Sequence, residues 1–99
     1  MPMPTQHKLM WYVLLALRTL GGTATNSEVE AEIVSILGLS PEQAAQAHRR
    51  SRITELGYRC AWARTYLRKM GAISPVSKAV WRLTTVGASL NESAARIKR

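Results

Sequence analysis

The stretch Tyr58-Arg59-Cys60-Ala61-Trp62-Ala63-Arg64-Thr65-Tyr66-Leu67-Arg68-Lys69-Met70-Gly71 predicts one amphipathic helix that ends at the glycine. When successive residues are placed 100° apart, an apolar side separates from a polar side. The apolar side should pack on a core and holds Leu56, Cys60, Ala63, Leu67 and Met70. The polar side interleaves cations with aromatic rings and a hydroxyl, in Tyr58, Ala61, Trp62, Thr65, Arg68 and Lys69. Because these groups suit phosphate oxygens and base edges, we expect this side to face DNA.

The helix should begin near Thr54, and after its end the apolar pattern changes to the two-residue period of strands. Two strands are predicted at residues 73–76 and 80–84, joined by residues 77–79. Pro75 requires an edge position because it has no N–H to donate. Lys78 lies at the predicted hairpin tip, where the wing of a DNA-binding domain contacts the DNA backbone or minor groove. An ordinary surface lysine is the alternative for this position. The residues predicted to face the core are Ile73, Trp81 and Leu83.

The remaining helices are predicted from their capping residues. Thr5 caps a first helix, and Thr25 with Glu28 has the capping-box spacing of a second. Ser40 with Gln43 has the same spacing and opens a short third helix. These helices should run to about Leu20, Leu37 and Ala47, and a last helix should follow a cap at Thr84 or Thr85 through Val86, Leu90, Ala94 and Ile97.

The first helix contains nine consecutive hydrophobic residues, Leu9 to Leu17. This run is shorter than the roughly 20 residues that a bilayer span needs, so no membrane segment is expected. A signal-peptide core is an alternative that the thin flanking charge and the lack of a clear cleavage site disfavour. We expect a core helix that is apolar on more than one side, with a homodimer through this helix as a further alternative.

Positive charge is concentrated in one part of the chain, whose formal net charge is +8. Residues 1–48 carry two cations against four glutamates, whereas residues 49–82 carry nine cations against one glutamate. This imbalance favours an anionic partner over an evenly charged solubilising surface. Within it, the connection before the basic helix holds Arg49, Arg50 and Arg52, which we predict to grip phosphates. An exposed loop with solvated charges is the alternative for these three arginines.

The residue inventory argues against catalysis within this chain. It has no aspartate, six glutamates, two histidines and one cysteine. Cys60 lies on the apolar side of its helix and should be a buried, inert thiol. A single cysteine, which cannot form an internal disulfide, fits a reducing cytoplasm. Glu28 and Glu32 share a helix face, but surface glutamates explain them more simply than a metal site does. No cysteine–histidine set has zinc spacing, so we expect no catalytic residue, metal or cofactor.

The order of helix, helix, short helix, long basic helix, hairpin and helix predicts a winged helix-turn-helix, which is a mainly α fold with a small β-hairpin. We expect one DNA-binding domain over residues 1–99, ordered from about residue 5 to residue 95.

The basic helix and hairpin carry a more specific resemblance. Residues 58–73, together with Val80-Trp81-Arg82-Leu83-Thr84-Thr85-Val86-Gly87, resemble the N-terminal domain of Mrr-type restriction endonucleases, which are type IV, modification-dependent enzymes. The run from Trp62 to Leu67 is its most specific part, and the similarity covers most of residues 5–92. The resemblance implies DNA binding for an enzyme that attacks methylated DNA, with the nuclease on a separate domain. The chain would then be a reader module of a longer protein or a free-standing relative.

Recognition of a methylated base would fall to Tyr58, Trp62 and Tyr66, because an added methyl group favours an apolar contact. These rings could also stack on an extruded base. The alternative is that Trp62 and Tyr66 pack against the first helix or the wing. Arg64 lies on the opposite margin, where it contacts phosphate or pairs with a glutamate of the second helix.

We therefore predict a module that binds double-stranded DNA and recognises target DNA, methylated in the leading hypothesis, for a restriction system. A transcription regulator of the same fold and a protein-interaction winged helix are the alternatives. The predicted DNA-binding residues are Arg49, Arg50, Arg52, Tyr58, Trp62, Thr65, Arg68, Lys69 and Lys78.

Overall fold

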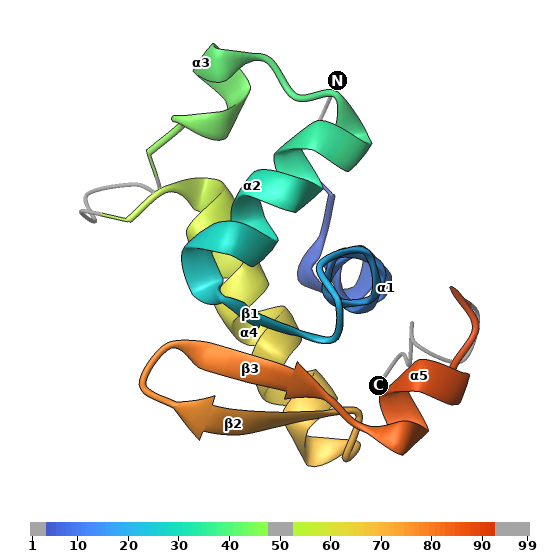
Figure 1. Ribbon diagram of the computed structural model, residues 1–99. Helices are drawn as coiled ribbons and strands as arrows, with labels where there is room; N and C mark the ends of the chain where they lie inside the picture. The colour runs from blue at the N-terminus through green and yellow to red at the C-terminus, as the bar shows by residue number, and fades with distance from the viewer. Residues whose placement is uncertain (1–3, 48–52, 93–99) are drawn as a thin grey trace.

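The computed structural model describes residues 4–47 and 53–92 of the chain (Figure 1). The helices are α1 (Gln6–Thr19), α2 (Asn26–Leu37), α3 (Pro41–Ala44), α4 (Glu55–Lys69) and α5 (Thr85–Ser89). The strands are β1 (Thr23–Thr25), β2 (Ile73–Ser77) and β3 (Val80–Leu83). The described chain is thus mainly helical with a small antiparallel sheet, and its fold is the winged-helix-like one that the sequence predicts.

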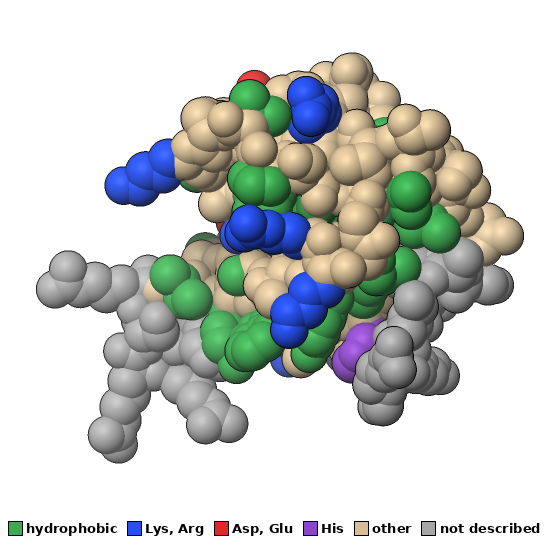
Figure 2. Space-filling model, turned by 90° about the horizontal axis from the view of Figure 1, so that it is seen from below, with side chains coloured by type: hydrophobic (Ala, Val, Ile, Leu, Met, Phe, Trp, Pro, Cys, Tyr) green, Lys and Arg blue, Asp and Glu red, His purple; other side chains and the backbone are tan. Residues whose placement is uncertain are grey.

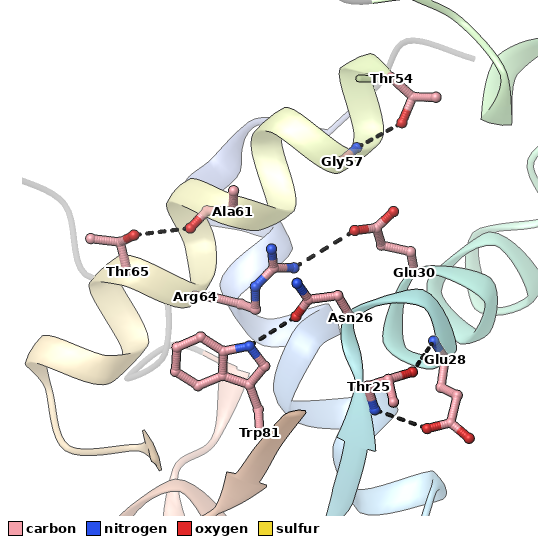
Figure 3. Close-up of polar contacts among 10 residues, drawn as sticks. All are labelled: Thr25, Asn26, Glu28, Glu30, Thr54, Gly57, Ala61, Arg64, Thr65 and Trp81. Carbon is pink, nitrogen blue, oxygen red and sulfur yellow. Dashed lines mark hydrogen bonds and ion pairs between the residues drawn. The ribbon is translucent and has the colours of Figure 1, made fainter. Parts of the chain in front are cut away.

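Local hydrogen bonds set the helix starts. The Thr25 hydroxyl accepts the Glu28 N–H at 3.1 Å, and the Glu28 carboxylate accepts the Thr25 N–H at 2.8 Å (Figure 3). Ser40 and Gln43 form the same reciprocal pair. Because such bonds join residues only three apart, they can be recognised in sequence, and the predicted starts are confirmed. The single-residue caps are Thr5, Thr54 and Thr84.

Helix α1 lies at the centre of the core and contacts α2, α4, α5 and β3. Figure 1 shows it nearly end-on beside α2 and α5. Its fully or almost fully buried residues are Leu9, Met10, Val13, Leu14, Ala16 and Leu17. Packing inside one domain therefore accounts for the apolar run without a second copy of the chain, and the homodimer stays a prediction. No helix in residues 4–47 and 53–92 has the length and apolarity that crossing a bilayer requires.

The sheet has the strand order β1-β3-β2, so β3 is hydrogen-bonded on both sides. Strand β2 is at an edge, where Pro75 was predicted to lie. Strand β1 is not predicted by the sequence and corrects the two-stranded hairpin. Thr23 pairs with Arg82, and the Leu83 N–H donates to the Gly22 carbonyl at 2.7 Å. A three-residue strand has too little alternation to recognise, and its partner lies far along the chain.

Helix α3 is shorter than predicted and ends at Ala44 instead of about Ala47. The alanines that follow have a high helix propensity, but this part of the chain pairs with the start of α4 instead of continuing the helix. Ala47 forms an antiparallel bridge with Thr54, and the Gln46 carbonyl accepts the Glu55 N–H at 2.8 Å. This pairing joins the two ends of the basic connection beside the start of α4.

Helix α5 is also shorter than predicted, because Leu90 is extended, with ψ of 140°. The prediction of one continuous helix through Leu90 is therefore wrong. The guanidinium of Arg18 donates to the carbonyls of Gly87 and Leu90 and takes the place of further helical N–H donors. The predicted continuation at Ala94 and Ile97 lies outside the described residues.

Candidate nucleic-acid interface

Helix α4 has the two sides that the sequence predicts. Its apolar side packs mainly on α1 and holds Leu56, Cys60, Ala63 and Leu67, all buried, with Met70 partly buried at the end. Thr54 caps its start by accepting the Gly57 N–H at 3.0 Å (Figure 3). Gly71, with φ of +78°, follows its end in a conformation that glycine adopts without strain. These contacts fix which side of α4 faces solvent.

The solvent side of α4 displays most of the predicted binding residues. Trp62 is 42% exposed, and Thr65, Arg68 and Lys69 are exposed, while Tyr58 is half-buried. The Thr65 hydroxyl donates to the Ala61 carbonyl at 3.0 Å, so its oxygen remains able to accept. The placement of these residues on one side agrees with the sequence, and their role as DNA contacts stays a prediction.

The hairpin adds Lys78, which is exposed in the turn between β2 and β3. The neighbouring Ala79 has φ of +60°, an uncommon conformation for a residue with a side chain, and completes this tight turn. The other residues predicted to contact the DNA backbone lie outside the described residues, and they are Arg49, Arg50 and Arg52.

Exposed positive charge gathers on the end of α4 and the hairpin. Within residues 4–47 and 53–92, five lysines and arginines are exposed, and four of them lie on these two elements. The four are Arg68, Lys69, Lys78 and Arg82, and the fifth is Lys8. Figure 2, which views the molecule from below Figure 1, shows Lys and Arg side chains spread over this face with hydrophobic groups between them and little acidic surface. Such a face complements a polyanion.

Three aromatic rings form a row that joins α4 to the first turn of α1. Trp62 and Tyr66 lie with ring centroids 5.9 Å apart, and Tyr66 stacks on His7 at 5.4 Å with the rings only 11° from parallel. Tyr66 is packed against the core, as the packing alternative predicts, whereas Trp62 stays exposed at the end of the row. His7 was missed by sequence reasoning, because its place beside Tyr66 depends on how α1 and α4 pack.

Arg64 turns away from the exposed side and is buried, with 8% of its surface exposed. Its Nη1 lies 3.7 Å from Glu30 Oε2 on α2, so the predicted alternative of a pair with a glutamate of the second helix is confirmed (Figure 3). That separation is too long for a hydrogen bond, and Nη1 has no hydrogen-bond partner in the described part of the chain. Burial raises the pKa of the Glu30 carboxyl, and the positive charge of Arg64 offsets only part of this rise.

The raised pKa of Glu30 predicts an unusual effect of neutralising it. The unfolded carboxyl titrates near its ordinary pKa of 4.5, and the folded one at a higher pH. Between these two pKa values the folded state holds a proton that the unfolded state has lost, so stability falls as pH rises through this window. Glu30→Gln should therefore match the wild type below pH 4.5 and be slightly more stable at neutral pH.

Urea unfolding from acid to neutral pH measures this difference, with Glu32→Gln on the same helix as the control that should stay within about 0.5 kcal/mol of the wild type. Arg64→Met should be destabilising by about 1–2 kcal/mol, because it leaves the Glu30 carboxylate without its counter-charge. A Glu30→Gln protein that is clearly less stable than the wild type at neutral pH would show that the ion pair outweighs the cost of burial.

Cys60 faces the core of the domain rather than the exposed side of α4. It is fully buried, and burial followed by the negative charge of Glu30 raises the pKa of its thiol to about 12. The thiolate, which is the reactive form, is therefore scarce, and the prediction of burial is confirmed. Among the described residues no three His, Cys, Asp or Glu side chains are grouped to hold a metal ion.

Together these features define a small winged-helix-like domain with cations and aromatic rings along its long helix and its hairpin. The family model described as the Mrr N-terminal domain matches residues 7–93, and the chain belongs to that family. Membership indicates a role in a restriction system, in agreement with the resemblance seen in the basic helix. No curated protein and no solved structure matches the chain.

Proposed function

We propose that this domain binds double-stranded DNA through the exposed side of α4 and so recognises target DNA for a restriction system. The observation that carries the proposal is the joint exposure of Trp62, Thr65, Arg68 and Lys69 on one side of a 15-residue helix. An α-helix fits the DNA major groove, which is about 12 Å wide. Membership of the Mrr N-terminal domain family supports the restriction role. On this proposal the chain reads DNA, and cleavage belongs to a separate nuclease domain.

The exposed groups divide by chemistry. Arg68 and Lys69 supply charge for phosphates and donors for guanine edges, and the Thr65 hydroxyl suits either. Lys78 lies where the hairpin tip would meet the backbone. Arg49, Arg50 and Arg52 remain proposed backbone grips from the sequence alone. Phosphate contacts fix the position of the protein on the duplex, whereas contacts with base edges specify the site.

We further propose that the modified form of the DNA is preferred because of Trp62. A methyl group in the major groove presents an apolar surface, which an exposed indole complements better than a cation does. Trp62 lies beside Tyr66, which in turn stacks on His7, and this row would hold the indole in place before DNA arrives. Tyr58, one turn before Trp62, is the second proposed contact with the methyl group.

The deciding experiment measures binding of the chain to one duplex that is unmodified, N6-methylated at adenine or 5-methylated at cytosine, over a series of salt concentrations. If the chain binds DNA, the logarithm of the association constant K should fall linearly with the logarithm of the salt concentration, with a slope of about −0.9 per phosphate neutralised. A methylated form bound at least about tenfold more tightly, which is roughly 1.4 kcal/mol, would support the reader function.

Three variants separate DNA binding itself from the preference for methylated DNA. Arg68→Ala combined with Lys69→Ala should weaken binding to every form and lower the salt slope by about two. Trp62→Ala should abolish the methyl preference and leave the salt slope unchanged. Lys8→Ala is the control, because Lys8 is an exposed cation that belongs to α1 and not to α4 or the hairpin.

Equal, salt-sensitive binding to all three duplexes would favour a winged-helix regulator and remove the methyl preference for the site tested. Absence of binding at low salt would overturn the proposal in favour of a protein partner.

A further inference from the structure

The outer face of the sheet carries an arginine between two hydroxyl groups. Arg82 on the central strand β3 lies directly opposite Thr23 on β1 and Ser74 on β2. Residues that lie opposite each other in neighbouring strands point to the same face, with Cβ atoms about 4.5–5.5 Å apart. Arg82 and Thr23 are exposed and Ser74 is partly exposed. We call these three residues the Arg82 row.

Packing of the inner face fixes the direction of this row. Trp81 and Leu83, the neighbours of Arg82 along β3, pack toward the core, and the Trp81 indole N–H donates to Asn26 Oδ1 at 2.8 Å (Figure 3). Because side chains alternate along a strand, Arg82 must point to solvent. Strand β3 is hydrogen-bonded on both sides, so the backbone that carries Arg82 is held in place.

The Arg82 guanidinium is available for a ligand. Within residues 4–47 and 53–92 it has no hydrogen-bond or ion-pair partner. Two glutamates of the neighbouring helix α2 are already engaged, since Glu28 completes the cap at Thr25 and Glu30 faces Arg64. An unpaired arginine flanked by hydroxyl donors is the kind of group that binds phosphate oxygens.

We propose that the Arg82 row binds a backbone phosphate of the duplex, outside the groove that α4 occupies. This inference rests on the proposed DNA binding. Ser74 follows Lys69, the last residue of α4, by five positions in the chain, a path of at most about 18 Å. This path is short enough for the row and the cations of α4 to contact one duplex. Figure 2 shows Lys and Arg side chains at several separate places on this side of the molecule, with other and hydrophobic surface between them.

The test compares variants of the full chain by fluorescence anisotropy on a duplex longer than two helical turns, over a salt series. Arg82→Ala should weaken binding about fivefold, equally for all sequences, and lower the salt slope by about one. Arg82→Lys should keep the salt slope of the wild type but only part of its affinity, because lysine lacks the planar guanidinium that can donate two hydrogen bonds to one phosphate. Thr23→Val and Ser74→Ala should each weaken binding about twofold. Lys8→Ala should bind as the wild type does.

The outcomes separate this inference from the proposed function. If the wild type shows no salt-sensitive binding, DNA binding itself fails. If the wild type binds and Arg82→Ala behaves like Lys8→Ala, the row is a solvated surface and the inference is overturned. Thermal melting of each variant checks the fold, and Thr23→Val keeps a good strand former even if Arg82→Ala proves unstable.

Discussion

Replacing Gly87 with alanine should destabilise the domain by about 2–3 kcal/mol. Gly87 is buried in α5, and a Cβ there would lie 2.1 Å from the Ala72 carbonyl oxygen and 2.9 Å from Leu83 Cδ1. A backbone oxygen cannot move aside as the end of a side chain can, so α5 must shift off the sheet. A glycine-to-alanine substitution inside a helix is usually stabilising, because alanine is favoured over glycine by about 1 kcal/mol there. The expected effect at Gly87 is therefore opposite in sign.

Urea unfolding of Gly87→Ala against the wild type measures this loss. The matched control is Ala88→Gly, the reverse substitution at the next position, where the side chain is exposed. Helix propensity alone should make that control less stable by about 1 kcal/mol or less. If Gly87→Ala were as stable as the wild type, the close packing of α5 on residue 72 would be wrong.

Replacing Arg18 with alanine should cost about 2–3 kcal/mol of unfolding free energy. Its Nη2 lies 3.0 Å from the Gly87 oxygen, 3.2 Å from the Ala88 oxygen and 2.6 Å from the Leu90 oxygen. These carbonyls are at the end of α5, where helical N–H donors run out and positive charge is favoured. Nη2 has only two hydrogens, so the three contacts are worth about two charged hydrogen bonds. The guanidinium also lies 5.0 Å from the Trp11 ring centroid.

The measurement combines global unfolding with amide hydrogen exchange in α5. Arg18→Ala should raise exchange in α5 more than in α1 or α4, because α5 loses its tie to α1. Arg18→Lys keeps the charge but removes the guanidinium that lies over the Trp11 ring, and it should recover about half of the loss. Lys8→Ala, an exposed cation on the same helix, is the control. Uniform exchange across all three helices would contradict a local tie.

The features that the sequence predicts well are those whose causes lie a few residues apart. The capping pairs Thr25 with Glu28 and Ser40 with Gln43 are local, and so is the two-sided pattern of α4. The family resemblance in the basic helix is likewise carried by a continuous run, and the match over residues 7–93 confirms it.

The features that sequence reasoning missed depend on partners far along the chain. Strand β1 is defined by pairing with β3, and the stack of His7 on Tyr66 by the packing of α1 on α4. At the early end of α5, the Leu90 carbonyl accepts a hydrogen bond from Arg18, more than sixty residues upstream. Part of the candidate site is of this kind, since Thr23 joins Arg82 only through β1.

The position of β1 also has a consequence for how the chain folds. Thr23 and Arg82 meet in the sheet although α2, α3 and α4 lie between them. Closing so long a loop carries an entropic cost that must be met before the pairing contributes any stability. The helices, with their local caps, can form first, and the sheet closes when α1 and α4 have already brought its strands together. We therefore expect β1–β3 pairing to be absent from the folding transition state, so that Thr23→Gly speeds unfolding and leaves the folding rate unchanged.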